Sequence, residues 1–271
     1  MIQKDIGSLS VFHFEKLLRY PELLHFVSSR MGGVSKTPYN SLNLGFHVGD
    51  DPQKVVANRQ MLTSALYIPM NSLTTAKQIH FDKVRVVTKE LIGRGAFDYD
   101  SALDVTDAMI TVIPEVCLCV VVADCVPIMF FDPVKKAIGV AHAGWKGTLK
   151  HIAQRIVMTL QREYSCYPKD IVVGIGPSIG PCCYSVDAEV IAEIRSVFGI
   201  NTSYVKNVSS NGKGYFDLWS ANYDQLAQIG IPKENIELVR ICTYHNVELF
   251  FSERHQKGRT GRFAAGMMLS T

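Results

Sequence analysis

Three residues of metal-ligand type stand out in this sequence: His80, Cys125 and His142. Each ends or follows an apolar run that is predicted to form a strand, so all three are expected at one sheet edge. They are 45 and 17 residues apart, whereas a structural zinc site takes four ligands from closely spaced pairs. Three ligands from separate elements suit a catalytic zinc ion with an open fourth position. The alternative is a buried structural cysteine with two hydrogen-bonded histidines.

The same residues also permit chemistry without a metal ion. Cys125 as nucleophile and His142 as general base would make the protein a cysteine hydrolase. A third possibility is a non-catalytic binding module that a metal ion stabilises. The metal content of the purified protein distinguishes the two enzyme mechanisms.

The composition is that of a globular protein with a substantial core. Of 271 residues, 47% are hydrophobic and 20% are charged, and the net charge is +3. The longest basic tract is Lys135–Lys136, so nucleic-acid binding through a phosphate-tracking surface is not expected. The longest apolar stretch, 116–123, is too short for a membrane span, and no secretory signal is expected. Seven cysteines, an odd number, favour free thiols and a cytoplasmic location.

Periodicity predicts alternating strands and helices over the C-terminal two thirds of the chain. Strands are expected at 84–88, 116–123, 137–142, 171–175, 236–242 and 247–251. Helices are expected to begin near Asp51-Pro52, Leu149, Asp187 and Asp217. Residues 93–107 show little periodicity and are expected to form a loop over the site. No fixed repeat or proline-rich linker is present, so residues 1–271 are interpreted as one domain.

Several short motifs, spread from about Arg30 to Arg262, resemble one family. They are GGVSKTPYNSLNLGFHVGDD with NR following, TDAMIT, ADCVPI, AHAGWKG, IGPSIGPCCYSV and FFSERHQKGRTGR. In these motifs the chain is similar to the polyphenol oxidase (laccase)-like family of purine nucleoside phosphorylases. That family also contains the peptidoglycan editing factors.

The resemblance implies an α+β fold, a four-layer α/β/β/α sandwich in which two mixed sheets lie between helical layers. It also implies cleavage of adenosine, inosine and S-methyl-5′-thioadenosine by phosphate, giving the free base and a ribose 1-phosphate. Deamination of adenosine is an implied companion activity, which a metal-activated water attacking C6 of adenine would explain. The expected partners are therefore purine nucleosides and phosphate, with no nucleic acid, no membrane and no obligate protein partner.

By resemblance, His80, Cys125 and His142 are the zinc ligands and the catalytic centre. The family name also implies copper, but eight histidines without a His-x-His pair cannot supply a multicopper cluster. The peptidoglycan editing members, which remove wrongly added amino acids from a muramyl precursor, imply the rival function. That function fits either a Cys–His hydrolase or a zinc hydrolase.

Four polar residues of the motifs are expected to contact the substrate: Arg30, Asn43, Gln78 and Arg254. An arginine can bind phosphate through two hydrogen bonds, which suits Arg30 or Arg254. Asn43 and Gln78 can bond base edges or ribose hydroxyls, although each could equally stabilise a turn. The chain departs from the family pattern close to these positions, at Lys146, Glu253 and His255.

For several residues next to the expected ligands, the sequence is compatible with more than one role. Asp124 either orients a ligand, accepts a substrate hydroxyl or caps a strand end. Gly144 and Gly147 permit a close backbone approach, as expected of a loop that wraps a ligand. Trp145, between them, either offers an aromatic face to a purine or packs in the core.

The adjacent pair Cys182-Cys183 is not expected to bind a metal ion. Two neighbouring cysteines cannot readily share one tetrahedral ion, and the surrounding Gly-Pro repeats indicate a shaped loop.

Overall fold

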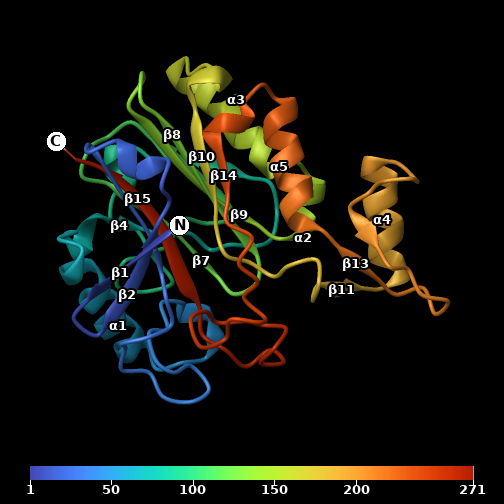
Figure 1. Ribbon diagram of the computed structural model, residues 1–271. Helices are drawn as coiled ribbons and strands as arrows, with labels where there is room; N and C mark the ends of the chain where they lie inside the picture. Colours follow the sequence, from blue (N-terminus) through green and yellow to red (C-terminus); the bar gives the residue numbers. More distant parts are fainter. Residues whose placement is uncertain (271) are drawn as a thin grey trace.

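Two mixed six-stranded sheets packed face to face form the centre of the molecule (Figure 1). The computed structural model describes residues 1–270. The order of the first sheet is β1 (Ile2–Ile6), β2 (Leu9–His13), β3 (Leu23–Ser28), β15 (Phe263–Leu269), β7 (Cys117–Val122), β4 (Leu73–Thr74). The order of the second is β14 (Ile236–Leu238), β10 (Val172–Ile175), β8 (Val126–Asp132), β9 (Ala137–Ala143), β6 (Ala108–Thr111), β5 (Val84–Val86).

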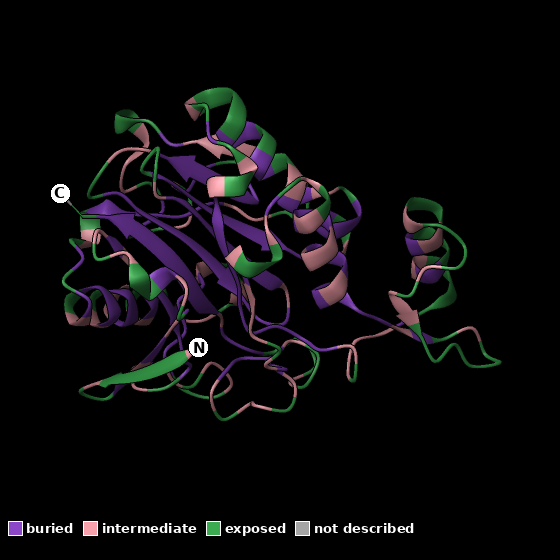
Figure 2. Cartoon of the chain, turned by 45° about the horizontal axis from the view of Figure 1, so that its top comes forward, coloured by how far each residue is buried: buried purple, intermediate pink, exposed green. Residues whose placement is uncertain are grey.

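Helices cover the outer faces of both sheets, so the molecule has four layers. On the first sheet, α1 (Pro52–Ala65) buries Leu62 against Cys119 and Val121 of β7. On the second sheet lie α2 (Trp145–Leu149), α3 (Ile152–Tyr164) and α5 (Leu218–Gln228). The central strands β7, β8, β9 and β15 are buried along their whole length, whereas the edge strand β1 is exposed (Figure 2). The expected α+β fold, a four-layer α/β/β/α sandwich with mixed sheets, is confirmed.

Three aspartates begin helices, as the sequence predicts. Asp51 accepts a hydrogen bond from the backbone N–H of Gln53, with Pro52 in the first turn of α1. Asp187 caps α4 (Ala188–Phe198), and Asp217 caps α5. Each carboxylate satisfies an N–H that the helix itself leaves without a partner.

The structure corrects three predicted element boundaries. The helix expected from Leu149 is interrupted at His151, whose φ of 59° lies in the left-handed region, so α2 and α3 are separate. The strand expected at 236–242 ends at Leu238. Residues 247–251 form no strand, because Phe250 and Phe251 reach the core between the sheets from a turn.

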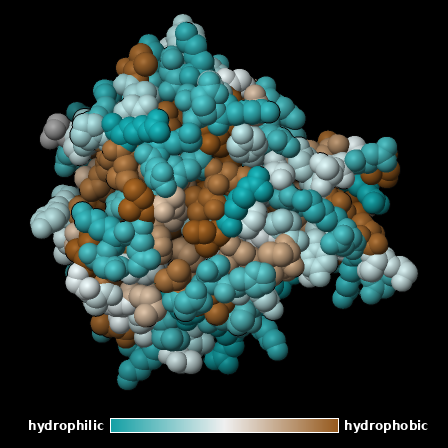
Figure 3. Space-filling view, in the orientation of Figure 1, coloured by the Kyte–Doolittle hydropathy of each residue, from teal (hydrophilic) through white to brown (hydrophobic). Residues whose placement is uncertain are grey.

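A third, three-stranded sheet and α4 form a lobe at one side of the sandwich (Figures 1 and 3). The order of this sheet is β11 (Ser185–Val186), β13 (Gly214–Phe216), β12 (Val205–Lys206). Short 3-10 turns occur at Leu17–Arg19, Phe46–Val48, Met70–Ser72, Lys89–Leu91, Pro168–Asp170 and Lys233–Asn235. Within residues 1–270, the helices lack the combination of length and apolar character needed to cross a membrane.

Candidate metal centre

Two of the expected ligands, His80 and Cys125, lie where the chain crosses from the first sheet to the second. His80 is in the loop between β4 and β5, and Cys125 is on the turn between β7 and β8. Asp124 makes that turn sharp, with a φ of 87°. His142 lies near the end of β9, and the register pairs it with Pro127 of β8. The antiparallel pairing therefore brings Cys125 and His142 to the same end of the second sheet.

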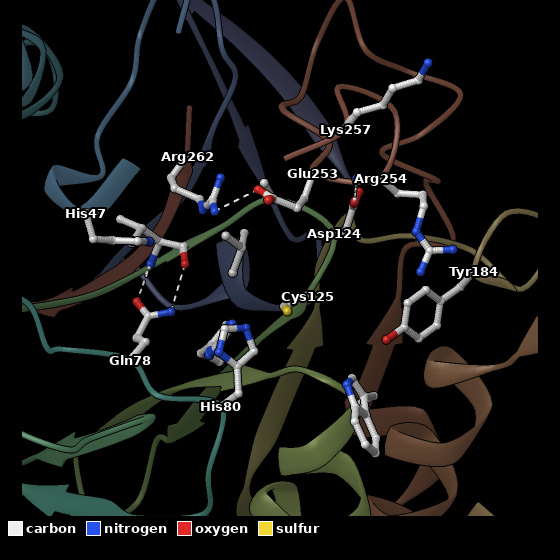
Figure 4. Close-up of a pocket in the computed structure, with 15 residues that line it drawn as sticks. His47, Gln78, His80, Asp124, Cys125, Tyr184, Glu253, Arg254, Lys257 and Arg262 are labelled. Carbon is white, nitrogen blue, oxygen red and sulfur yellow. Dashed lines mark hydrogen bonds and ion pairs between the residues drawn. The ribbon is translucent and has the colours of Figure 1, made fainter. Parts of the chain in front are cut away.

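The three side chains converge on one point, where Figure 4 shows His80 beside Cys125. One ligand atom from each of His80, Cys125 and His142 lies within 4.8 Å of the other two. The two imidazole rings are nearly perpendicular, with centroids 4.7 Å apart. The expected close backbone approach at Gly144 is confirmed. A Cβ atom there would lie 2.9 Å from Cδ2 of His80 and 3.0 Å from Sγ of Cys125.

Asp107 holds this arrangement in place, a role that its local sequence does not predict. It directly precedes β6, whose pairing with β9 places it opposite His142. Its carboxylate lies 2.8 Å from Nδ1 of His142 and accepts the backbone N–H groups of Ile79, His80 and Phe81. A carboxylate on the far nitrogen of a ligating histidine fixes the ring and its tautomer, which leaves Nε2 for a metal ion. The TDAMIT motif was the available signal for this residue.

The electrostatics of the triad favour an ionised thiol. Burial raises the pKa of Cys125, but the charges and hydrogen bonds of His142 and His80 outweigh burial and lower the pKa to about 6. Burial lowers the pKa of His142, while the Cys125 thiolate and Asp107 together raise it to about 9. The thiolate is the form of cysteine that ligates metals and acts as a nucleophile.

The triad lines a cavity of about 610 Å³. Its wall contains Val121, Val122 and Ala123 of the β7 end and the aromatic side chains of Trp145 and Tyr184. Charged and polar side chains complete the lining: His47, Gln78, Asp124, Glu253, Arg254, Lys257 and Arg262. The expected loop 93–107 contributes no residue to this lining, although Asp107 at its end supports two ligands.

Two of the four expected substrate contacts reach the cavity. The amide of Gln78 donates to the carbonyl of Val121 and accepts its N–H, at 2.8 and 2.9 Å. One N–H and one lone pair of that amide remain for a ligand. Arg254 is exposed, donates to Ser185 and lies with its guanidinium 5.1 Å from the centre of the Tyr184 ring.

The structure places Arg30 and Asn43 away from the cavity lining. The guanidinium of Arg30 donates to the carbonyls of Asn40 and Val247 and lies over the ring of Phe251. Asn43 is fully buried, and its amide makes four hydrogen bonds, with Asp50, Arg262 and twice with Gly45. These contacts occupy the polar groups of both side chains in fixing loops, which for Asn43 is the turn-stabilising alternative expected from the sequence.

Asp124, next to the ligand Cys125, holds two neighbouring loops against the turn between β7 and β8. Its carboxylate accepts the hydroxyl of Thr243 at 2.6 Å and the backbone N–H of Arg254 at 2.7 Å. Both acceptor oxygens therefore bind other loops. Beside it, Glu253 forms an ion pair with Arg262 at 2.8 Å, drawn dashed in Figure 4.

The donor set fits a single borderline-soft metal ion. One thiolate and two imidazoles, anchored by a carboxylate behind one ring, match a three-ligand zinc site. Among residues 1–270, one other group of histidine, cysteine or acidic side chains is close enough to bind a metal ion. It contains Cys182, Cys183, Cys242 and His245.

The chain is similar over most of its length to several known proteins. A family model described as multi-copper polyphenol oxidoreductase laccase matches residues 24–270. The chain is 40% identical over 239 residues to purine nucleoside phosphorylase YlmD of Geobacillus stearothermophilus, covering 88% of this chain and 87% of that protein. A purine nucleoside phosphorylase of Bacteroides thetaiotaomicron is 32% identical over 257 residues, covering 94% and 95%. The crystal structure of YlmD from Geobacillus stearothermophilus matches with a TM-score of 0.93 at 36% identity, covering 99% and 98%.

Proposed function

Since the chain belongs to the multi-copper polyphenol oxidoreductase laccase family, in which relatives are named purine nucleoside phosphorylases, we propose that it is a zinc-dependent purine nucleoside phosphorylase. Its proposed substrates are adenosine, inosine and S-methyl-5′-thioadenosine, with deamination of adenosine as a second activity. The convergence of His80, Cys125 and His142 in the wall of a cavity with cationic side chains carries this proposal.

In the proposal, His80, Cys125 and His142 hold one zinc ion. When bound, the metal supplies a Lewis acid with an open coordination position. Asp107 keeps the His142 ring oriented, and Gly144 leaves room for the ligands to approach. Three ligands at one point suit a single ion, which supports zinc over the copper cluster of the family name.

The substrate is proposed to lie between the ligands and the charged part of the lining. Arg254 and Lys257 would bind phosphate, since Arg262 is already paired with Glu253. Trp145 and Tyr184 offer aromatic faces to a purine, and Gln78 has one N–H and one lone pair left for a base edge or ribose hydroxyl. Phosphate would then attack the anomeric carbon as the bond to the base breaks.

The phosphate requirement tests the reaction. With adenosine and phosphate, the zinc-loaded protein should release adenine and ribose 1-phosphate. Without phosphate, only slower formation of inosine should remain, because phosphate is a substrate of the first reaction only. Cys125→Ala should lose both activities. Adenine release at the same rate without phosphate would show hydrolysis and would contradict the phosphorylase.

The lowered pKa of Cys125 supports a second candidate, a Cys–His hydrolase that edits peptidoglycan precursors. In that mechanism the thiolate attacks a carbonyl carbon, and His142 protonates the leaving group as its bond to that carbon breaks. Water, deprotonated by His142, then hydrolyses the thioester on Cys125 and releases the carboxylate product. The two candidates differ in their response to metal removal. A chelator should abolish the nucleoside reactions of the zinc enzyme, whereas a metal-free hydrolase should keep its activity and lose it to a thiol alkylating agent.

A further inference from the structure

Four ligand-type side chains converge at the root of the projecting lobe, outside the cavity lining. Cys182 and Cys183 lie in the loop between β10 and β11, and Cys242 and His245 lie beyond β14. One atom from each lies within 4.8 Å of the other three. This group is separate from the proposed catalytic triad, with which it shares no residue.

The segment that leads to Cys182-Cys183 and the segment that carries Cys242 and His245 are joined by backbone hydrogen bonds, independently of the four side chains. The N–H of Ser178 donates to the carbonyl of Ile241, and the N–H of Thr243 donates to the carbonyl of Ser178. In the first segment, the N–H groups of Cys183 and Tyr184 both donate to the carbonyl of Gly180, at 2.9 and 3.0 Å. The resulting turn brings the two adjacent cysteine side chains to one side, toward the second segment.

The distances among Cys182, Cys183 and His245 are close to those of a tetrahedral site, and Cys242 lies within 4.8 Å of each. The sulfur atoms of Cys182 and Cys183 are 3.5 Å apart, and Sγ of Cys183 is 3.2 Å from Nε2 of His245. Zn–S bonds of about 2.3 Å in tetrahedral geometry place two sulfur atoms about 3.8 Å apart. The sulfur atoms of the adjacent pair therefore have nearly the separation that one zinc ion requires. The pair alone was not expected to bind an ion, but Cys242 and His245, which are distant in sequence, supply two further ligands.

We propose that Cys182, Cys183, Cys242 and His245 bind a second zinc ion in a closed, four-ligand structural site. Three thiols and one imidazole are the donor set of structural zinc sites, which keep no open position. On binding, the thiols ligate as thiolates and release their protons to solvent. This proposal does not depend on the proposed function, because it uses none of the catalytic ligands.

A metal ion at this site would link the loop that carries Tyr184, a residue of the cavity lining, to the segment that follows β14 of the second sheet. Tyr184, which lines the cavity, directly follows Cys183, and Ser185 accepts two hydrogen bonds from Arg254. The same loop leads into β11 and the lobe (Figure 1). A metal ion at this point would join residues 182–185 to residues 242–245 and so fix the position of Tyr184.

Metal counting on purified variants tests the site. The full chain, prepared anaerobically with zinc and freed of loosely bound metal, should hold about two zinc ions. The double variant Cys182→Ala/His245→Ala changes two exposed ligands, so its fold should persist, and it should hold about one. A matched control, Cys166→Ala/His255→Ala, removes a cysteine and a histidine outside both groups and should still hold about two. Circular dichroism checks that each variant is folded.

Cobalt substitution identifies the ligands of each ion. The thiolate-to-cobalt absorption should fall strongly in Cys182→Ala/His245→Ala and only partly in Cys125→Ala, because the second site has three thiolates. Equal zinc content in the full chain and Cys182→Ala/His245→Ala would overturn the proposal, as would a Cys182–Cys183 disulfide in the zinc-loaded protein. A single zinc ion lost only in Cys125→Ala would overturn it and leave the catalytic site standing. A single ion lost only in Cys182→Ala/His245→Ala would support the second site and contradict zinc binding by His80, Cys125 and His142.

Discussion

Oδ1 of Asp107 lies 2.8 Å from Nδ1 of His142, and the same oxygen accepts the backbone N–H of His80 at 3.0 Å. One carboxylate therefore positions two of the three proposed ligands, one through its ring and the other through its backbone. The pairing of β6 with β9 creates this relationship, because it places Asp107 directly opposite His142.

Asp107→Asn should weaken zinc binding at the catalytic site by about 10- to 100-fold, as is typical when the partner of a ligating histidine is lost. An amide cannot bear the negative charge that stabilises the ring and can accept through only one oxygen. Competition with a chromophoric chelator measures the affinity. Asp104→Asn is the control, since Asp104 is exposed and pairs with Lys77. Unchanged affinity in Asp107→Asn would contradict the supporting role.

Gly144→Ala should disturb the catalytic site while leaving the sheets intact. The new methyl group would press on His80 and Cys125, at 2.9 and 3.0 Å. Overpacking of this kind costs about 1–3 kcal/mol, and if that cost falls on the metal-bound state it corresponds to a loss of about 5- to 150-fold in zinc affinity. Gly147→Ala, in α2, is the control, because the three atoms nearest to its methyl group belong to Phe81, Ile152 and the backbone of His142 and not to a ligand side chain. Wild-type affinity in Gly144→Ala would show that the ligands tolerate the added group.

Arg254→Ala should weaken phosphorolysis of adenosine by about 1.5–3 kcal/mol in kcat/KM, through the loss of a charge-assisted contact with phosphate. Deamination should be spared, because it uses no phosphate. Separate assays of adenine and inosine measure the two reactions. Arg259→Ala, an exposed arginine outside the cavity lining, is the matched control. Equal loss of both reactions would mean that Arg254 maintains the cavity through Ser185 and Tyr184.

His25 should make the protein less stable in acid. Burial, followed by the charge of His13, lowers the pKa of His25 to about 3, and its Nε2 accepts the N–H of Phe14. Between about pH 6.5 and 3 the unfolded chain binds a proton that the folded chain excludes, so stability falls as pH falls. At pH 4 this loss is on the order of 3 kcal/mol.

The variant His25→Gln keeps an acceptor but does not titrate, so its stability should depend less on pH. Urea unfolding at pH 7 and pH 4 measures the difference, and the contribution of the metal sites cancels because both proteins contain them. His255→Gln, at an exposed position, should behave like the unmodified chain. Parallel pH profiles for His25→Gln and the unmodified chain would exclude this effect of His25.

Local signals predicted three helix starts and the core strands β7, β9 and β10, but not β8 or β15. Asp51, Asp187 and Asp217 cap helices as expected, because capping depends only on residues within one turn. The strand predicted at 247–251 was wrong. A turn whose side chains are buried between the sheets contains the same apolar residue types as a buried strand, so the pattern does not distinguish them.

The three ligand residues of the candidate metal centre could be predicted from the sequence, but the residue that orients them could not. His80, Cys125 and His142 were identified from their positions after apolar runs and from the family motifs. Asp107 was not, because its role follows from the register between two strands that are separated in sequence. The meeting of Cys182 with Cys242 depends likewise on a contact between distant segments that no local pattern records.

The position of β15 has a consequence for biosynthesis. This strand begins at Phe263, yet it lies inside the first sheet between β3 and β7, and β7 leads directly to Cys125. On the ribosome, the three proposed catalytic ligands emerge well before the strand that joins the two halves of that sheet. The growing polypeptide therefore holds its ligands on an incomplete frame, and loading of the catalytic metal should follow translation rather than accompany it.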